Sequence, residues 1–89
     1  MVIRKSPRVA WRTIAGEGVV LSLDTRMLRG LNPVGTRVWE LIDGHRAVDD
    51  IATEIAREFG VEAERARADV DAFVAELADK HLVEMVHAP

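Results

Sequence analysis

Residues 18–44 limit the possible folds of this chain more than any other stretch. Residues 19–23 are apolar at every second position, which is typical of a strand with one buried face. Residues 27–31 form a second candidate strand, and the Asn-Pro pair at 32–33 follows it directly. Asn caps helices well and Pro is tolerated at the first helical position, so we expect a helix over 33–42. The stretch therefore predicts two strands and a helix in close succession.

The rest of the chain extends this pattern at both ends. Residues 8–14 alternate in polarity and predict the first strand of a three-stranded antiparallel meander. Segments 48–59 and 62–80 each carry one apolar stripe and predict a second and a third helix. Residues 82–86 are a short apolar tail, expected as a brief strand or an extended segment, and residues 1–7 are expected to be a loose lead-in. These elements predict an α+β, winged helix-turn-helix fold, with a three-stranded antiparallel sheet followed by three helices.

Composition narrows the class of protein. The 89 residues are expected to form one domain, 1–89, with a core over about 8–86. The hydrophobic fraction of 48% suits a globular chain, and the absence of cysteine excludes disulfides and zinc-thiolate sites. No apolar run approaches the roughly 20 residues of a membrane span. We therefore expect a soluble cytoplasmic protein.

Charge is divided unevenly along the chain. Residues 1–31 carry six basic and two acidic side chains, and residues 32–89 carry six basic and thirteen acidic ones. The sheet is thus expected to be basic and the helices acidic, which fits either ordinary solvated faces or a mixed-charge groove where the two meet. The third predicted helix has three basic and six acidic side chains, so phosphates should repel it. We expect no nucleic-acid binding.

No residue pattern indicates catalysis. The histidines His45, His81 and His87 have no second ligand at helical spacing and are expected to be exposed bystanders, with Ala88 and Pro89 free. The glycines stand singly at turns and element ends, so there is no phosphate-binding loop. We therefore predict that the protein is not an enzyme and needs neither a metal nor a cofactor.

The third predicted strand, Met27 to Leu31, lies at the end of the meander, so one of its edges should be open. An open edge exposes backbone donors and acceptors to which another chain can add as a strand. Gly30 would allow close backbone approach, although a bulge or turn also explains a glycine there. Val70 and Val74 of the third helix would border the site, unless both are wholly core.

Three motifs occur in the order and spacing of a known family. They are Gly18-Val19-Val20-Leu21-Ser22-Leu23, Leu31-Asn32-Pro33-Val34-Gly35 with Val38-Trp39-Glu40-Leu41-Ile42-Asp43-Gly44, and Asp69-Val70-Asp71-Ala72-Phe73-Val74-Ala75-Glu76-Leu77 with Leu82-Val83. Over about residues 8–84 the chain resembles the PqqD-like family, the RiPP recognition elements of peptide-modification pathways. Two positions depart from the family pattern: Ala47 replaces a threonine cap, and Leu28-Arg29 replaces an aromatic in the third strand.

The resemblance implies a peptide chaperone without DNA binding. Such proteins hold the leader of a ribosomally made precursor peptide as an added strand between the third strand and the third helix. They present the peptide to a modifying enzyme, often a radical SAM protein, or to a leader peptidase in lasso-peptide pathways. Carried onto this chain, the resemblance implies a peptide-binding site of nine residues: Met27, Leu28, Arg29, Gly30 and Leu31, facing Arg67, Val70, Asp71 and Val74.

Two other functions remain open from the residues. A winged-helix DNA-binding regulator would use the same fold, although its acidic helices argue against it. A self-associating structural module would pair the open edge with a second copy. The sequence is compatible with either a monomer or a homodimer.

Overall fold

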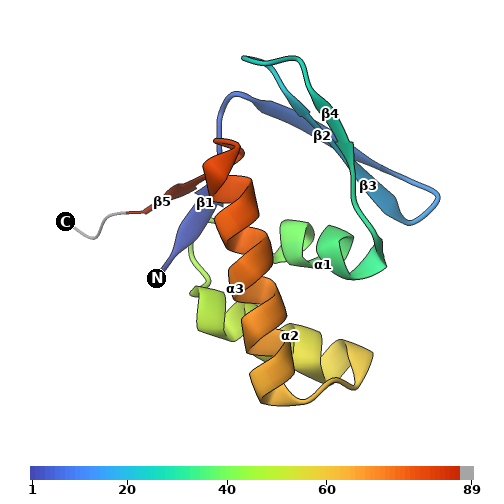
Figure 1. The fold of residues 1–89 in the computed structure, drawn as a ribbon, viewed down its shortest axis with the longest axis vertical. Helices are drawn as coiled ribbons and strands as arrows, with labels where there is room; N and C mark the ends of the chain where they lie inside the picture. The colour runs from blue at the N-terminus through green and yellow to red at the C-terminus, as the bar shows by residue number, and fades with distance from the viewer. Residues whose placement is uncertain (87–89) are drawn as a thin grey trace.

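The computed structural model describes residues 1–86 (Figure 1). Its elements in chain order are β1 (Ile3–Lys5), β2 (Val9–Ile14), β3 (Glu17–Ser22), β4 (Leu28–Gly30), α1 (Pro33–Leu41), α2 (Val48–Phe59), α3 (Ala63–Asp79) and β5 (Val83–Met85). The expectations for His87, Ala88 and Pro89 lie outside the described residues. The predicted α+β class, with a three-stranded antiparallel sheet followed by three helices, is confirmed.

The larger sheet has the order β2-β3-β4, and both pairings are antiparallel. Val20 in the central strand lies opposite Trp11 of β2 and Arg29 of β4. Its side chain is buried, and so are Gly18 and Ser22 two positions to either side. Because side chains alternate between the faces of a strand, this register turns one face of the sheet toward the helices.

The predicted loose lead-in is wrong. Residues Ile3–Lys5 form β1, which pairs antiparallel with β5, and the Ile3 side chain is 1% exposed. The other edge of β1 is also occupied, because the amides of Gly44 and Val48 donate to the carbonyls of Ile3 and Met1 at 3.0 and 2.8 Å. The expected tail at 82–86 thus supplies a strand, and a buried isoleucine anchors the start of the chain to the core.

The helix boundaries follow from local chemistry. The Asn32 side chain caps α1 by accepting a hydrogen bond from the Gly35 amide at 2.6 Å. Gly60 ends α2 at a φ of +65°, a conformation that costs glycine little. Ala47 precedes α2 and has no side-chain acceptor, so only Asp50 contributes there, by accepting from the Ala47 amide at 3.3 Å.

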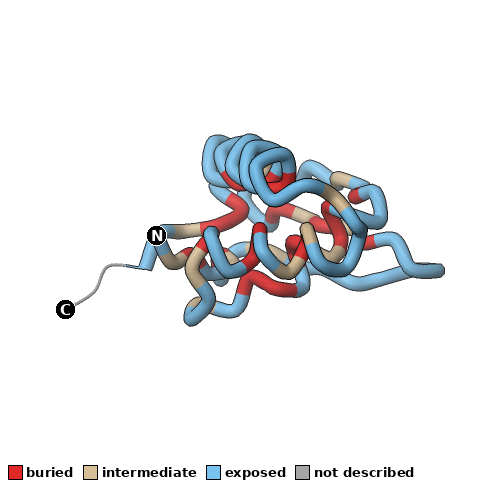
Figure 2. Tube along the Cα trace, turned by 90° about the horizontal axis from the view of Figure 1, so that it is seen from below, coloured by how far each residue is buried: buried red, intermediate tan, exposed pale blue. Residues whose placement is uncertain are grey.

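The core lies between the helices and the sheets, with exposed residues on the outer surfaces (Figure 2). It is built around the fully buried Trp39 ring and consists of Ile3, Val20, Leu31, Val38, Trp39, Leu41, Ile42, Val48, Ile51, Ala52, Ile55, Ala66, Val70, Val74, Leu77, Leu82 and Val83. Helix α3 runs between the β1–β5 ribbon on one side and the β2–β3–β4 sheet on the other (Figure 1). Within residues 1–86, no helix has the length and apolarity needed to cross a membrane.

Candidate functional site: a groove beside the open edge of β4

Strand β4 has one neighbour in the described chain, and its other edge is open. Ser22 donates to the Met27 carbonyl at 3.1 Å and Leu31 donates to the Gly18 carbonyl at 2.8 Å, so the backbone groups of 27, 29 and 31 point toward β3. In an antiparallel ladder the intervening residues point the other way. The N–H and C=O groups of Leu28 and Gly30 therefore face outward. A Cβ at Gly30 would meet nothing within 4 Å.

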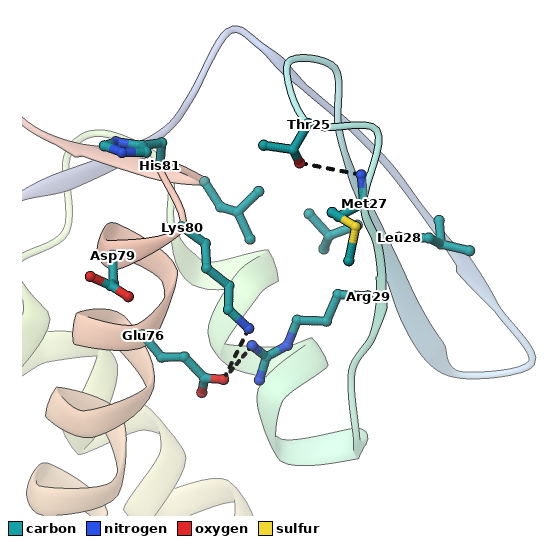
Figure 3. A pocket seen from close by; sticks show the side chains of 10 residues that line it. Thr25, Met27, Leu28, Arg29, Glu76, Asp79, Lys80 and His81 are labelled. Atoms are coloured by element: carbon teal, nitrogen blue, oxygen red, sulfur yellow. Dashed lines mark hydrogen bonds and ion pairs between the residues drawn. The ribbon is translucent and has the colours of Figure 1, made fainter.

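The side chains of β4 alternate across the sheet. Arg29 lies opposite the buried Val20 and faces the helices, whereas Leu28 is 66% exposed and turns away from α3 (Figure 3). Leu31, two residues after Arg29, is buried. The face toward α3 is thus supplied by Met27, Arg29 and Leu31, while Leu28 and Gly30 contribute backbone groups to the edge.

Two hollows lie between β4 and α3, and Arg29 and Glu76 border both of them. The first has a volume of about 510 Å³ and is lined by Val20, Thr25, Met27, Leu28, Arg29, Glu76, Asp79, Lys80, His81 and Leu82. The second has a volume of about 560 Å³ and is lined by Arg29, Gly30, Leu31, Asn32, Val34, Gly35, Val38, Asp69, Val70, Phe73 and Glu76. Together they form one groove along β4, which we call the β4–α3 groove.

An ion pair crosses this groove at its middle. Nη1 of Arg29 donates to Oε1 of Glu76, and Nζ of Lys80 lies 3.5 Å from the same oxygen (Figure 3). The Arg29 guanidinium also lies over the Phe73 ring, 5.7 Å from its centroid. The hydrogen bond from Arg29 holds the pKa of Glu76 below its usual value, with the charges of Arg29 and Lys80 acting in the same direction. Glu76 is therefore charged at neutral pH.

The structure places the nine predicted site residues in two locations. Met27, Leu28, Arg29, Gly30, Leu31 and Val70 line the β4–α3 groove. Arg67, Asp71 and Val74 instead line a separate hollow that also contains Ile3, Val83 and Met85, on the side of α3 that faces the β1–β5 ribbon. Arg67 is held there by Asp71 at 3.2 Å and by Asp49 of α2 at 2.9 Å.

Val70 and Val74 belong largely to the core, with exposures of 1% and 4%. The stripe of α3 that faces β4 instead consists of Asp69, Phe73, Glu76 and Lys80. These residues recur at the three- and four-residue spacing of one helical face, and this periodicity was the signal that could have identified them. The predicted stripe of Arg67, Val70, Asp71 and Val74 instead lies partly beneath these residues and partly on the opposite side of α3.

Lys5 is a partly buried basic group beside two tryptophan rings. Its Nζ lies 5.0 Å from the Trp11 ring centroid and 5.3 Å from that of Trp39, and it donates to the Ile42 carbonyl at 2.6 Å. Burial lowers the pKa of Lys5, while the charges of Asp43 and Glu40 oppose this shift.

Among residues 1–86 no group of three His, Cys, Asp or Glu side chains is arranged to hold a metal ion.

Solved structures with this architecture include proteins that were captured with peptides. TbiB1 in complex with the TbiA(beta) leader peptide is 30% identical, with 96% of this chain and 99% of TbiB1 covered and a TM-score of 0.86. A lasso peptide synthetase B1 complexed with the leader peptide is 19% identical, with 96% and 100% covered and a TM-score of 0.84. The second comparison, at its low identity, supports the fold alone.

A third similar structure is the PqqD truncation of Methylobacterium extorquens PqqCD, a stand-alone RiPP recognition element. It is 24% identical, with 94% of this chain and 89% of that chain covered and a TM-score of 0.77. Curated protein sequences gave no match. The family model for coenzyme PQQ synthesis protein D (PqqD) matches residues 17–83, which include the whole β4–α3 groove. This chain therefore belongs to the PqqD family.

Proposed function

We propose that this protein holds the leader of a ribosomally made precursor peptide as an extra strand on the open edge of β4. The single observation that carries the proposal is the outward-facing backbone of Leu28 and Gly30, which lies directly beside the β4–α3 groove. A strand added there would bond to these two residues, and its alternate side chains would enter the groove. Recognition by strand addition requires free backbone hydrogen-bonding groups and space for alternate side chains, and both lie beside β4.

Membership of the PqqD family supports leader binding, and so does the 30%-identical TbiB1, which was solved with a leader peptide. We propose that the protein then presents the bound precursor to a modifying enzyme and performs no chemistry itself. We propose either a radical SAM enzyme or a leader peptidase as that partner. Because ribosomes make the precursor, we place this step in the cytoplasm.

A leader that is disordered before binding loses conformational freedom when it becomes a strand. The affinity should therefore be moderate, on the order of micromolar to tens of nanomolar. Holding the leader raises the concentration of the rest of the precursor near the enzyme, and this increase is the proposed contribution to the reaction.

Titration of the ¹⁵N-labelled protein tests the site. The first probe is the TbiA(beta) leader, which the 30%-identical TbiB1 holds in its solved complex; leaders of other ribosomally made precursors follow. We expect the amides of Leu28 and Gly30 to shift most, because they would donate to the added strand. The amide of Thr13, on the opposite edge of the sheet, should stay unchanged. Shifts confined to any other surface would contradict the proposal.

A further inference from the structure

Arg29 lies across the middle of the β4–α3 groove, and its guanidinium is only partly used. Within the described residues, its one hydrogen bond runs from Nη1 to Glu76. The guanidinium carbon lies over the Phe73 ring, 5.7 Å from its centroid. A guanidinium has five N–H donors arranged to bind a carboxylate through two parallel hydrogen bonds. Nε and Nη2 of Arg29 therefore remain available to a second acceptor.

The centre of the groove also has more positive than negative charge. Arg29 and Lys80 both approach Glu76, so two cations share one carboxylate. Two further carboxylates, Asp69 and Asp79, line the hollows, but among the described residues neither forms an ion pair with Arg29 or Lys80: Oδ2 of Asp69 lies 3.8 Å from Nε of Arg65, and Asp79 lies apart from the cluster (Figure 3). The Arg29 side chain is only 27% exposed, so solvent screens its charge less than that of a surface arginine. One more carboxylate would balance this cluster.

The strand register determines which residue of a bound peptide would reach this cluster. A peptide residue directly beside Arg29 projects from the same face of the extended sheet, toward α3. Peptide residues two positions before and after it project from that face as well, about 7 Å away along the strand. They would lie over the two hollows, of which one offers Val20, Met27 and Leu82 and the other Leu31, Val70 and Phe73.

We propose that the β4–α3 groove selects peptides with an Asp or Glu beside Arg29 and an apolar residue two positions to each side of it. This inference rests on the proposed function and specifies the sequence of its ligand. The peptide carboxylate would accept hydrogen bonds from Nε and Nη2 of Arg29, and the Lys80 ammonium would add a second favourable charge. A basic residue at the same position would instead face two cations.

Selection from a library of random twelve-residue peptides tests the preference. The library is displayed on phage and selected on immobilised wild-type protein and on three variants, Arg29→Gln, Arg29→Glu and Arg37→Gln, each checked for folding by circular dichroism. Arg37 forms a comparable pair with Glu58 at 2.9 Å, away from the groove, and is the matched control. We expect acidic enrichment on wild type and Arg37→Gln, none on Arg29→Gln, and a shift toward Lys and Arg on Arg29→Glu.

One peptide selected on wild type is then synthesised in two forms, with its acidic residue as Glu or as Gln. A charge-assisted hydrogen bond of this kind corresponds to about a tenfold loss of affinity for the Gln form on wild type. On Arg29→Gln the two forms should bind within about twofold of each other, because the partner is gone.

Three outcomes are distinguishable. The pattern above supports the inference. Peptides that shift the amides of Leu28 and Gly30 but show no acidic preference, or the same preference on Arg29→Gln, overturn the inference and leave the proposed function standing. A selection that yields no peptide bound at these amides overturns both.

Discussion

The two outer strands of the larger sheet, β2 and β4, both have open edges in the described chain, but their surroundings differ. β2 is six residues long and β4 only three. Beside β2, the Trp11 ring packs edge-on against the Trp39 ring with 6.2 Å between the ring centroids, and the Lys5 ammonium lies over both rings. Beside β4, two hollows of about 510 and 560 Å³ flank the cluster of Arg29, Glu76 and Lys80.

The comparison shows that strand length and an open backbone do not by themselves define a binding edge. Backbone bonds are the same for every peptide, so discrimination requires space for side chains next to the edge. At β2 the side chains of Trp11 and Lys5 fill that space, whereas at β4 the two hollows could accept the side chains of a bound peptide. The longer edge is therefore the structural one, and the shorter edge is the proposed site.

The largest expected effect concerns the aromatic residues of the two sides. Trp39→Ala should lower the free energy of unfolding by about 3–5 kcal/mol, because it empties a fully buried site. Phe73→Ala, at a partly buried ring that borders the groove, should cost less than half as much stability but should weaken peptide binding. Urea denaturation and peptide titration of both variants separate these effects. If Trp39→Ala and Phe73→Ala lost equal stability, the Phe73 side would be as much a part of the core as the Trp39 side, and the comparison would fail.

Proline substitution compares the two edges directly. Gly30→Pro removes an outward-facing N–H from β4, so peptide affinity should fall more than tenfold, while Gly30→Ala should bind normally because the site has room for a Cβ. On the other edge, the Arg8 carbonyl accepts a hydrogen bond from the Leu23 amide of the neighbouring segment at 2.8 Å. Because backbone groups alternate between the two edges of a strand, the N–H and C=O of Thr13 point away from β3. Thr13→Pro is therefore the matched control.

Isothermal titration calorimetry with one leader peptide measures all three variants. Loss of binding in Thr13→Pro, or normal binding in Gly30→Pro, would contradict the proposal that the peptide adds to the edge of β4.

A substitution far from both edges shows whether global stability limits binding. Ala47→Ser supplies the missing side-chain cap of α2 and should raise the free energy of unfolding by about 1 kcal/mol. In the double variant with Gly30→Pro, this gain should offset any stability that the proline removes, while the peptide affinity should stay low. Thermal melts and titrations of the double variant provide the measurement, and recovery of binding would show that the proline had acted through stability alone.

The smallest effect concerns acid. The pKa of Glu76 is lowered in the folded protein, so its stabilising contribution is present above its unfolded value near 4.5 and disappears as pH falls through the lower folded value. The difference in free energy of unfolding between wild type and Glu76→Gln should therefore be constant from pH 7 to about pH 5.5 and become smaller as the pH falls below 4.5. Urea unfolding across this range measures it. An unchanged difference at pH 3 would show that the ion pair contributes nothing.

Local patterns in the sequence predicted most of the fold. Alternation identified the strands at 8–14, 19–23 and 27–31, and the Asn32-Pro33 pair located the start of α1 at its observed residue. Residues 82–86 were expected as a brief strand or an extended segment, but β1 and its pairing with β5 escaped prediction, because these strands have three residues each and pair across almost the whole chain. No local signal reports such a long-range contact.

The candidate site was predicted less completely than the fold. Its strand followed from the end of the meander, whereas the stripe of α3 that faces it depends on how far the helix is rotated. A rotation by a fraction of a turn exchanges Arg67 and Asp71 for Phe73 and Glu76. An acidic helix with small apolar residues on several faces leaves that rotation undetermined until the helix is packed against its neighbours.

Pairing of β1 with β5 brings the two ends of the described chain to the same side of the molecule, across α3 from β4 (Figure 1). A linker fused before β1 or after β5 would thus emerge at nearly the same place and leave the groove unobstructed. An enzyme tethered at either end would sample a similar volume around the held substrate, so both fusion orders should raise its effective concentration to a similar degree.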